Sequence, residues 1–387
     1  MNDNSETRFS EEFTEEQETD KIFEYDNSQD IDIYPDATIK VEREQYSIYE
    51  LKRKFSKELI ILDPEFQRKY VWGTQQQSEL IESVLMGIPL PLFYLNETKD
   101  GKLVVVDGLQ RLTTFFKFLD NEFKLQDLKI LNNINDCYFS QLGEAFQSKL
   151  EDYQIIAQVI KPPTPERIKF DIFDRVNRGG TRLNQQEMRN ALYQGKATKL
   201  LKDLAESKAF LEATDNSITK DRMKDRYMIL RMVAFYLWRT NKLLDANGNL
   251  LEYRTKELDE FLGKAMERIN AMRDEDITKV RSVFLLSMEN NLLLFGNKAF
   301  RRTNGERRYP VNLILFESFG YLFSHFRKEV CNDNKTRITV RVNELMNDDS
   351  FKDLLSTDRG RGVVIPQIFN KIDQLKEEFQ RDFAADN

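Results

Sequence analysis

Apolar residues recur along the chain with two different spacings. Residues 103–106, Leu-Val-Val-Val, form a continuous apolar run, which is typical of a strand covered on both faces. Asp107 and Gly108 interrupt this run. From Arg111 onward apolar residues recur at helical spacing as far as Leu119. The pattern therefore predicts a buried strand, a glycine turn and a helix in direct succession.

The same reasoning predicts the other elements. The hairpin-type turn at Asp100-Gly101 should make the two strands beside it antiparallel neighbours. Asn184 and Glu187 have the spacing of a capping box, which predicts a helix start. Predicted strands are 92–95, 103–106, 123–131 and 153–160; predicted helices are 47–60, 75–86, 139–150, 166–178, 184–194, 224–240, 255–272, 279–294, 311–329 and 365–382.

These elements predict an α+β protein, with a small mixed sheet followed by an all-helical region. Residues 1–40 are acidic, polar and without periodicity, so they are expected to form a disordered tail. We expect the sheet domain in residues 41–160 and the helical domain in residues 161–387. A chain of 387 residues has room for two or three domains with an ample core.

The net charge of −7 is unevenly distributed. Residues 1–50 contain 16 acidic and 4 basic side chains, whereas residues 51–387 contain 54 basic and 49 acidic ones. The body of the protein is therefore mildly basic behind an acidic segment. Such a segment is either a solvated tail or a competitor of nucleic acid for the basic body.

Composition excludes several classes of protein. No apolar run approaches the roughly 18 residues that a membrane span needs, and the N-terminus lacks the pattern of a signal peptide. We therefore expect no membrane and a cytoplasmic location. Cys137 and Cys331 lie far apart, which argues against disulfide or zinc frameworks. His325 is the single histidine, so sites that need several histidines are excluded, and we expect it to have a packing role.

The predicted strand–turn–helix is a candidate anion site. The first amides of a helix have no intrahelical acceptor and carry the positive end of its dipole. Arg111 at this point matches phosphate in shape and charge, or else pairs with Asp107. Asp107 could hold Mg²⁺ or orient an attacking water, or it caps the helix. Thr113 and Thr114 either contact phosphate or metal, or satisfy backbone amides.

Other signals are weaker. Neither a GxGxxG fingerprint nor a P-loop is present. An arginine cluster around Asn304-Gly305 reads as a basic loop, either solvated or in contact with DNA phosphate; its members are Arg301, Arg302, Arg307 and Arg308.

Four segments together resemble the N-terminal domain of GmrSD-type type IV restriction enzymes. They are FQRKYVW, the IPLP turn, VVVDGLQRLTTF and FDRVNRGGTRLNQQEMRNAL, in this order. The likeness runs from about residue 46 to 240, and in weaker form to 325. It implies a fold similar to ParB and sulfiredoxin, with a helical region following. It also implies binding and hydrolysis of a nucleoside triphosphate such as GTP with Mg²⁺, in defence against bacteriophage DNA.

The resemblance carries over to named residues. The hallmark DGQQR stands here as Asp107-Gly108-Leu109-Gln110-Arg111. Asp107 and Gln110 are the implied catalytic residues, and Asp107 the implied metal ligand. The implied nucleotide-binding residues are Gln67, Arg68, Trp72, Gly108, Arg111, Thr113, Thr114, Asn177 and Arg178, with Tyr70 as an alternative stacking residue to Trp72.

Two departures from the family pattern change this expectation. Leu109 replaces a glutamine, which removes an amide that could have bonded nucleotide or water. A single histidine cannot build the HNH nuclease domain that family members often add. We therefore expect a nucleotide-binding subunit that acts on DNA with a separate nuclease as partner. The alternative is a non-catalytic DNA-binding adaptor or regulator whose nucleotide pocket is vestigial.

Overall fold

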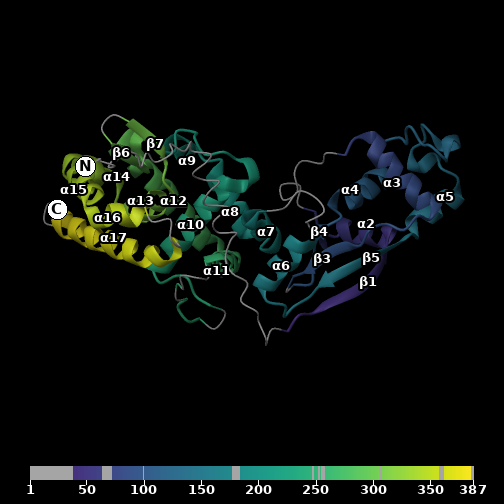
Figure 1. The fold of residues 1–387 in the computed structure, drawn as a ribbon, viewed down its shortest axis with the longest axis horizontal. Coiled ribbons are helices and arrows are strands. Elements are labelled where there is room, and N and C mark those ends of the chain that lie inside the picture. Colours follow the sequence, from purple (N-terminus) through teal and green to yellow (C-terminus); the bar gives the residue numbers. More distant parts are fainter. Residues whose placement is uncertain are drawn as a thin grey trace, which may run out of the picture. The chain divides into compact units, whose positions relative to one another are not determined.

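The computed structural model describes residues 38–62, 72–98, 100–176, 184–245, 248–251, 253, 258–304, 307–356 and 361–384. The chain divides into two compact units, residues 31–192 and 193–387, called here the N-terminal and the C-terminal unit (Figure 1). Residues 1–37 of the expected tail lie outside the described residues. The expected domain boundary after residue 160 stays a prediction, and residues 161–192 lie in the N-terminal unit.

A five-stranded mixed sheet forms the centre of the N-terminal unit. Its strands follow the order β1-β5-β3-β4-β2. β3 is antiparallel to β4, as the hairpin turn predicted, and parallel to β5. β1 pairs antiparallel with β5, and β2 pairs parallel with β4. The bounds are β1 (Val41–Ser47), β2 (Ile60–Ile61), β3 (Phe93–Glu97), β4 (Leu103–Asp107) and β5 (Gln154–Ile160).

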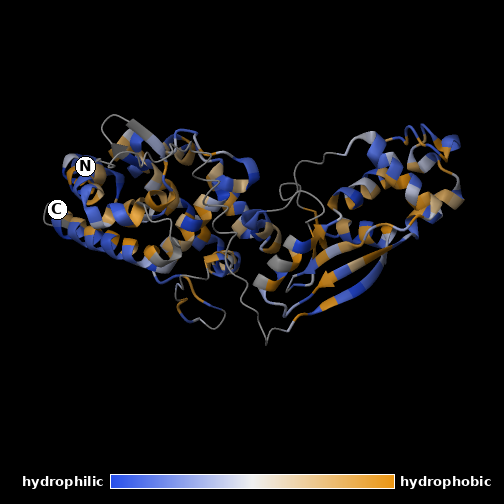
Figure 2. Ribbon diagram, in the orientation of Figure 1, coloured by the Kyte–Doolittle hydropathy of each residue, from blue (hydrophilic) through white to orange (hydrophobic). Residues whose placement is uncertain are grey.

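The first face of the sheet is covered by four helices, which gather on one side of it in Figure 1. They are α2 (Ile48–Ser56), α3 (Thr74–Met86), α4 (Leu109–Leu119) and α5 (Glu144–Glu151). Side chains alternate between the faces of a strand, so Phe93 and Leu95 of β3 and Leu103 and Val105 of β4 join this core. Figure 2 shows apolar residues along these strands. Burial on both faces accounts for the continuous apolar run of β4.

The second face of the sheet carries the alternate residues of each strand. Val104 of β4 packs there against Ala191 and Ile61 in a small separate cluster. Ala191 belongs to α7 (Gln185–Leu192), which follows α6 (Glu166–Val176). The predicted capping box at the start of α7 is confirmed. The Asn184 N–H donates to Glu187 Oε2 at 2.7 Å, and the Glu187 N–H donates to Asn184 Oδ1 at 2.8 Å.

The strand predicted for residues 123–131 is wrong. The segment forms no strand, and short 3₁₀ turns follow it at Asn132–Ile134 and Phe139–Gln141. Its amides find side-chain acceptors instead, because Glu82 Oε1 of α3 accepts from the N–H groups of Ile130 and Leu131, each at 2.8 Å. Burial alone would raise the pKa of Glu82, but these N–H donors lower it overall. The apolar residues of 123–131 lie in a loop, and their spacing alone led to the wrong prediction of a strand.

The C-terminal unit is mostly helical, as predicted, with one β-hairpin. The hairpin joins β6 (Arg301–Asn304) to β7 (Arg307–Val311). The helices are α8 (Lys196–Ala205), α9 (Lys208–Ala213), α10 (Lys224–Arg239), α11 (Leu258–Ala271), α12 (Asp274–Phe295), α13 (Leu313–Phe323), α14 (Lys328–Asp333), α15 (Lys335–Asn347), α16 (Asp349–Ser356) and α17 (Arg361–Ala384).

The expected basic loop at residues 301–308 is corrected in part. Arg301 is 3% exposed, and its guanidinium donates to the Thr214 carbonyl at 3.2 Å and to Ser217 Oγ at 2.8 Å. This arginine therefore binds other parts of its own unit and is not on a solvated loop. The side chains of Arg307 and Arg308 lie outside what the structure describes.

Helix α13 is the centre of the C-terminal unit. Every one of its residues is buried, because the sequence LILFESFGYLF is apolar on all sides. Its carbonyls accept from polar side chains of α12. Ser287 Oγ donates to the Gly320 carbonyl at 2.6 Å, and Asn290 Nδ2 donates to the Phe323 carbonyl at 2.9 Å. These bonds fix α12 along α13 without leaving the buried hydroxyl and amide donors unpaired.

No helix in the described residues is long and apolar enough to cross a bilayer.

An ion pair that is 1% exposed on both sides joins α10 to α13, because Arg231 Nε donates to Glu317 Oε1. Arg231 also donates to the Tyr227 hydroxyl at 2.8 Å. Arg231→Met would leave a buried carboxylate without its charge partner, so we expect a loss of about 3–5 kcal/mol in the free energy of unfolding. Urea denaturation measures it. Glu317→Leu added to Arg231→Met should recover most of the loss, and a single-variant loss under about 1 kcal/mol would contradict the assignment.

His325 has the packing role that the sequence predicted. Its Nδ1 lies 2.8 Å from the Tyr321 carbonyl, and its ring lies 4.7 Å from the Tyr321 ring. Burial lowers its pKa below the ordinary 6.5, and the charge of Lys376 acts in the same direction.

We therefore expect proton NMR of the single imidazole to give a pKa below 6.5 for His325. Because the folded pKa is lower than the unfolded one, this group's stabilisation is complete above pH 6.5. It is lost as the pH falls from 6.5 through the folded pKa. Replacing it in His325→Gln should flatten the pH dependence of unfolding in that window, and a measured pKa of 6.5 or higher would contradict the burial argument.

Candidate functional site

The turn between β4 and α4 requires glycine for two reasons. Gly108 has φ +100°, in the region that side chains avoid. A Cβ built at Gly108 would lie 2.2 Å from Cδ1 of Phe93. The ring of Phe93 therefore lies directly beneath the turn. This contact brings the first turn of α4 against the start of β3.

The N-terminus of α4 has no side-chain cap. Gly108 is the N-cap residue and offers no side-chain acceptor. The first intrahelical hydrogen bond runs from the Leu112 N–H to the Gly108 carbonyl at 2.9 Å. The N–H groups of residues 109–111 come before it and have no acceptor within the helix. Asp107, which the sequence offered as a cap, turns instead to Arg111. An uncapped helix start of this kind is a candidate anion site.

Arg111 is held by groups of the protein itself. Its NH2 donates to Asp107 Oδ2 at 2.9 Å and to the Leu92 carbonyl at 3.2 Å, and its NH1 donates to the Pro91 carbonyl. The guanidinium carbon lies 4.0 Å from the centre of the Phe93 ring. The side chain is 11% exposed, and burial lowers its pKa against the opposing effect of Asp107. A phosphate at Arg111 would share or displace Asp107.

The other polar residues of the first turns differ in accessibility. Thr114 is fully buried, and its hydroxyl donates to the Gln110 carbonyl at 2.8 Å. Thr113 is partly exposed, so it is the better placed of the two predicted threonines. The side-chain Oε1 of Gln110 is buried, and no hydrogen bond to it occurs in the described part of the chain. A buried acceptor without a donor destabilises the folded state unless a ligand or a water donates a hydrogen bond to it.

Leu109 is a core residue. It is 6% exposed and belongs to the apolar cluster beneath the first face of the sheet. A glutamine in this conformation would place its amide among apolar side chains, away from the mouth of the helix. Leucine at position 109, where the DGQQR pattern has glutamine, therefore affects the packing of the core first.

The remaining predicted residues are not assembled around this turn by the described structure. Trp72 is half-buried and packs against the core cluster, and its carbonyl accepts from Gln77 Nε2 at 3.2 Å. The other predicted residues lie outside the described residues; they are Gln67, Arg68, Tyr70, Asn177 and Arg178.

Sequence reasoning missed Tyr94 and Asn96, which lie on the second face of β3. Asn96 is 1% exposed, yet its Oδ1 accepts no hydrogen bond from any described residue. Tyr94 lies directly opposite Asp107. The alternation of apolar and polar positions in Phe-Tyr-Leu-Asn is the sequence signal for this face, and by itself it predicts only a strand.

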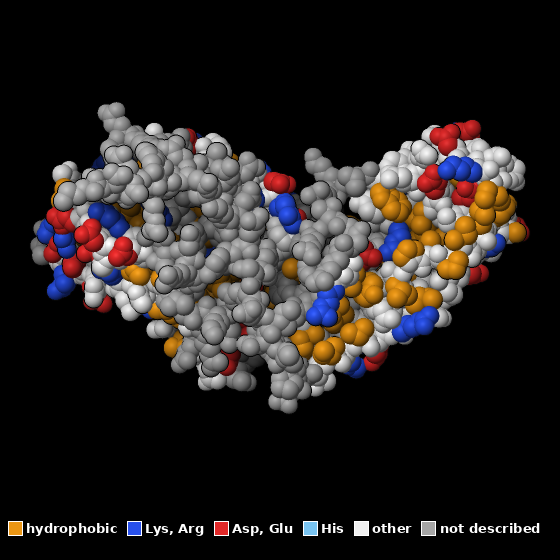
Figure 3. Space-filling view, in the orientation of Figure 1, with side chains coloured by type: hydrophobic (Ala, Val, Ile, Leu, Met, Phe, Trp, Pro, Cys, Tyr) orange, Lys and Arg blue, Asp and Glu red, His pale blue; other side chains and the backbone are white. Residues whose placement is uncertain are grey.

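The loop that enters β3 presents apolar side chains on a fixed backbone. Ile88 is 44% exposed and Leu92 is 38% exposed. The Tyr153 hydroxyl donates to the Ile88 carbonyl at 2.9 Å, and Arg111 holds the carbonyls nearer β3. Figure 3 shows apolar side chains on the visible surface of the N-terminal unit. Arg111 thus couples the anion site to this loop.

A Mg²⁺ ion fits the site only in company with phosphates. Asp107 is the one carboxylate among the residues of the turn, and Arg111 already binds its Oδ2. No group of three or more metal-ligating side chains occurs within the described ranges. Mg²⁺ is commonly held by one or two carboxylates together with substrate phosphates, and Asp107 could supply one such oxygen.

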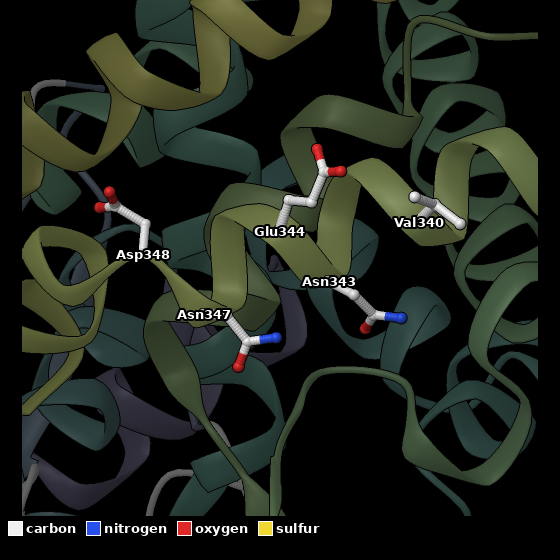
Figure 4. A pocket seen from close by; sticks show the side chains of 5 residues that line it. All are labelled: Val340, Asn343, Glu344, Asn347 and Asp348. Carbon is white, nitrogen blue, oxygen red and sulfur yellow. The ribbon is translucent and has the colours of Figure 1, made fainter.

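A surface depression on the C-terminal unit is a poor alternative site. It is open and is lined by Val340, Asn343, Glu344, Asn347 and Asp348 (Figure 4). Hydrogen bonds from Ser350 and from the Phe351 N–H lower the pKa of Asp348 to about 2. Its two carboxylates already pair with basic side chains, Glu344 with Arg341 and Asp348 with Lys371, and no side chain of the lining is a phosphate donor comparable to Arg111.

The core position of Leu109 leads to a test. Leu109→Gln should lower the free energy of unfolding by about 2–4 kcal/mol, because it removes apolar contacts and buries an amide. Leu109→Met, which conserves volume, should cost less than about 1.5 kcal/mol. Thermal and urea unfolding measure both. A glutamine variant as stable as the wild type would show that residue 109 can turn its side chain outward.

Comparison with known families assigns this region. Residues 48–194 match the family described as "GmrSD restriction endonuclease, N-terminal domain". Comparison with curated proteins gives no match. The recognition from sequence is confirmed over these residues, which include the DGLQR turn, and the match ends before the expected likeness does. Over residues 48–194 the chain is thus similar to the GmrSD restriction endonuclease N-terminal domain.

Proposed function

We propose that the N-terminal unit binds a nucleoside triphosphate with Mg²⁺ at the N-terminus of α4 and hydrolyses it. The observation that carries this proposal is the uncapped helix start behind β4, with Arg111 and Asp107 beside it. Backbone N–H groups at a helix start favour a phosphate by direction and by dipole. The family of residues 48–194 gives the setting, a restriction system.

The residues of the turn have different proposed roles. Arg111 and the first amides of α4 bind phosphate oxygens, and Thr113 offers a further donor. Asp107 would supply a carboxylate oxygen to Mg²⁺, and the ion would neutralise phosphate charge when bound. Gly108 lets the phosphate approach the backbone. Gln67, Arg68, Trp72, Asn177 and Arg178 are proposed as further walls of the nucleotide site, on the resemblance alone.

Gln110 is proposed to orient the attacking water. Its buried Oε1 is an acceptor without a described donor, so it can take a hydrogen bond from the water. The water oxygen forms a bond to the terminal phosphorus while the bond to the leaving diphosphate breaks. The products are a nucleoside diphosphate and inorganic phosphate, and the proton of the water passes to the phosphate.

DNA and a separate nuclease are the proposed partners. The sequence has a single histidine, too few for an HNH centre, so the proposal assigns cutting to another protein, in the cytoplasm. The second candidate function is a DNA-binding adaptor with a vestigial pocket. It is favoured by Arg111, whose guanidinium already binds Asp107 and two carbonyls. Binding of DNA that weakens with salt, in the absence of any nucleotide binding, would support it.

Calorimetric titration with each of the four Mg²⁺–NTPs tests the proposal. Arg111→Ala should weaken binding about 10- to 100-fold, because it removes charge-assisted hydrogen bonds to phosphate. Lys117→Ala, which removes one cation from the same helix, is the matched control and should change affinity less than twofold. Circular dichroism must show that both variants fold. Gln110→Leu should lower phosphate release and leave affinity nearly unchanged.

Two outcomes would overturn the proposed nucleotide function. No binding of any NTP with Mg²⁺ would remove the nucleotide function and leave the adaptor. Binding that is equal in Arg111→Ala and wild type would move the phosphates away from α4.

A further inference from the structure

The second face of the sheet is covered at one end and accessible at the other. At the covered end Val104, Asn96 and Ile160 are 0–1% exposed, and Ala191 of α7 packs there. At the accessible end Tyr94 and the strand residues beside it on β5 and β1 are partly or fully exposed. These residues are Ile156 and Gln158 of β5 and Arg43 and Gln45 of β1.

The pairing of the strands places four side-chain positions in one row. Asp107 lies opposite Tyr94, Tyr94 lies opposite Gln158, and Gln158 lies opposite Arg43. Neighbouring strands are roughly 4.8 Å apart, so the row crosses about 14 Å of sheet. It begins at the residue before Gly108. A nucleotide whose phosphates lie at α4 could therefore extend along this row.

A bulge sets the start of the row. The register of β3 and β4 shifts between Tyr94 and Leu95, so that Asp107 lies opposite Tyr94 while Val105 lies opposite Leu95. A bulge of this kind re-aims side chains and is frequent beside functional sites. Here it brings the carboxylate of the turn and the tyrosine into adjacent positions.

The side chains of this row are of types that bind a nucleobase. A tyrosine ring on a sheet can stack on any base, a carboxamide offers both a donor and an acceptor, and a guanidinium can stack or bond. The backbones of Tyr94, Gln158 and Arg43 pair in the sheet, but their side chains make no hydrogen bond or ion pair with other residues of the described ranges. Arg111, by contrast, already donates to Asp107 and to two backbone carbonyls. Asn96, two residues from Tyr94 on the same face, adds a buried acceptor with no described donor.

We infer that the accessible part of the second face, at Tyr94 and Gln158, binds the base of the nucleotide whose phosphates lie at the N-terminus of α4. The inference rests on the proposed nucleotide site. Tyr94 provides the stacking surface, Gln158 bonds the edge of the base, and Arg43 closes the far end of the row. The base contributes affinity that a bare polyphosphate does not have.

Two probes separate this inference from the function on which it rests. One is each Mg²⁺–NTP, and the other is inorganic tripolyphosphate with Mg²⁺, which has phosphates and no base. Tyr94→Ala should weaken the tightest NTP about 5- to 100-fold by loss of stacking, while tripolyphosphate binds within twofold of wild type. Tyr94→Phe keeps the ring and should stay within about threefold. Tyr49→Ala, at a tyrosine of α2 that is 57% exposed, is the matched control.

Each result decides something. NTP binding that is unchanged in Tyr94→Ala overturns the inference and leaves the nucleotide function intact. An equal loss of both probes also overturns it, because the tyrosine would then act on the turn and not on the base. Failure of wild type to bind either probe overturns the proposed function and the inference together. Loss of a single-stranded oligonucleotide in Tyr94→Ala, with NTP binding retained, would assign this face to DNA.

Discussion

The contact between Gly108 and Phe93 is the constraint on which the candidate site depends. The chain leaves β4 in a conformation that favours glycine, and the space of a side chain there is filled by the aromatic ring. Because the turn sits on Phe93, Arg111 one turn later lies over the same ring and reaches Asp107 and the loop before β3. A strand end, a helix start and an apolar loop are thereby held as one body.

This arrangement also explains how the unit can combine a rigid scaffold with an accessible site. The first face of the sheet is sealed by apolar packing against four helices, and Leu109 belongs to that packing. The second face is buried at one end, where Ala191 of α7 packs against Val104, and is accessible at Tyr94 and Gln158. Two buried acceptors without a donor among the described residues, Gln110 Oε1 and Asn96 Oδ1, occur beside the turn and on this face. Unpaired buried acceptors are tolerated mainly where function needs them.

The C-terminal unit combines apolar packing with buried polar pairs. Its central helix α13 is apolar on all sides, yet it carries Glu317, which pairs with Arg231 of α10. Side chains of α12 bond the carbonyls of α13. Buried polar groups of this kind add little net free energy, but they penalise any other arrangement of the helices.

The sequence by itself determined the fold class, the strand–turn–helix around Asp107-Gly108, the capping box at Asn184 and the family of the N-terminal domain, because each depends on local spacing or a contiguous motif. It could not determine that residues 123–131 are a loop, since that depends on Glu82, far away in the chain. Nor could it show that Leu109 faces the core or that Tyr94 lies opposite Asp107. Those follow from which face a residue occupies and from strand register, and only tertiary packing sets them.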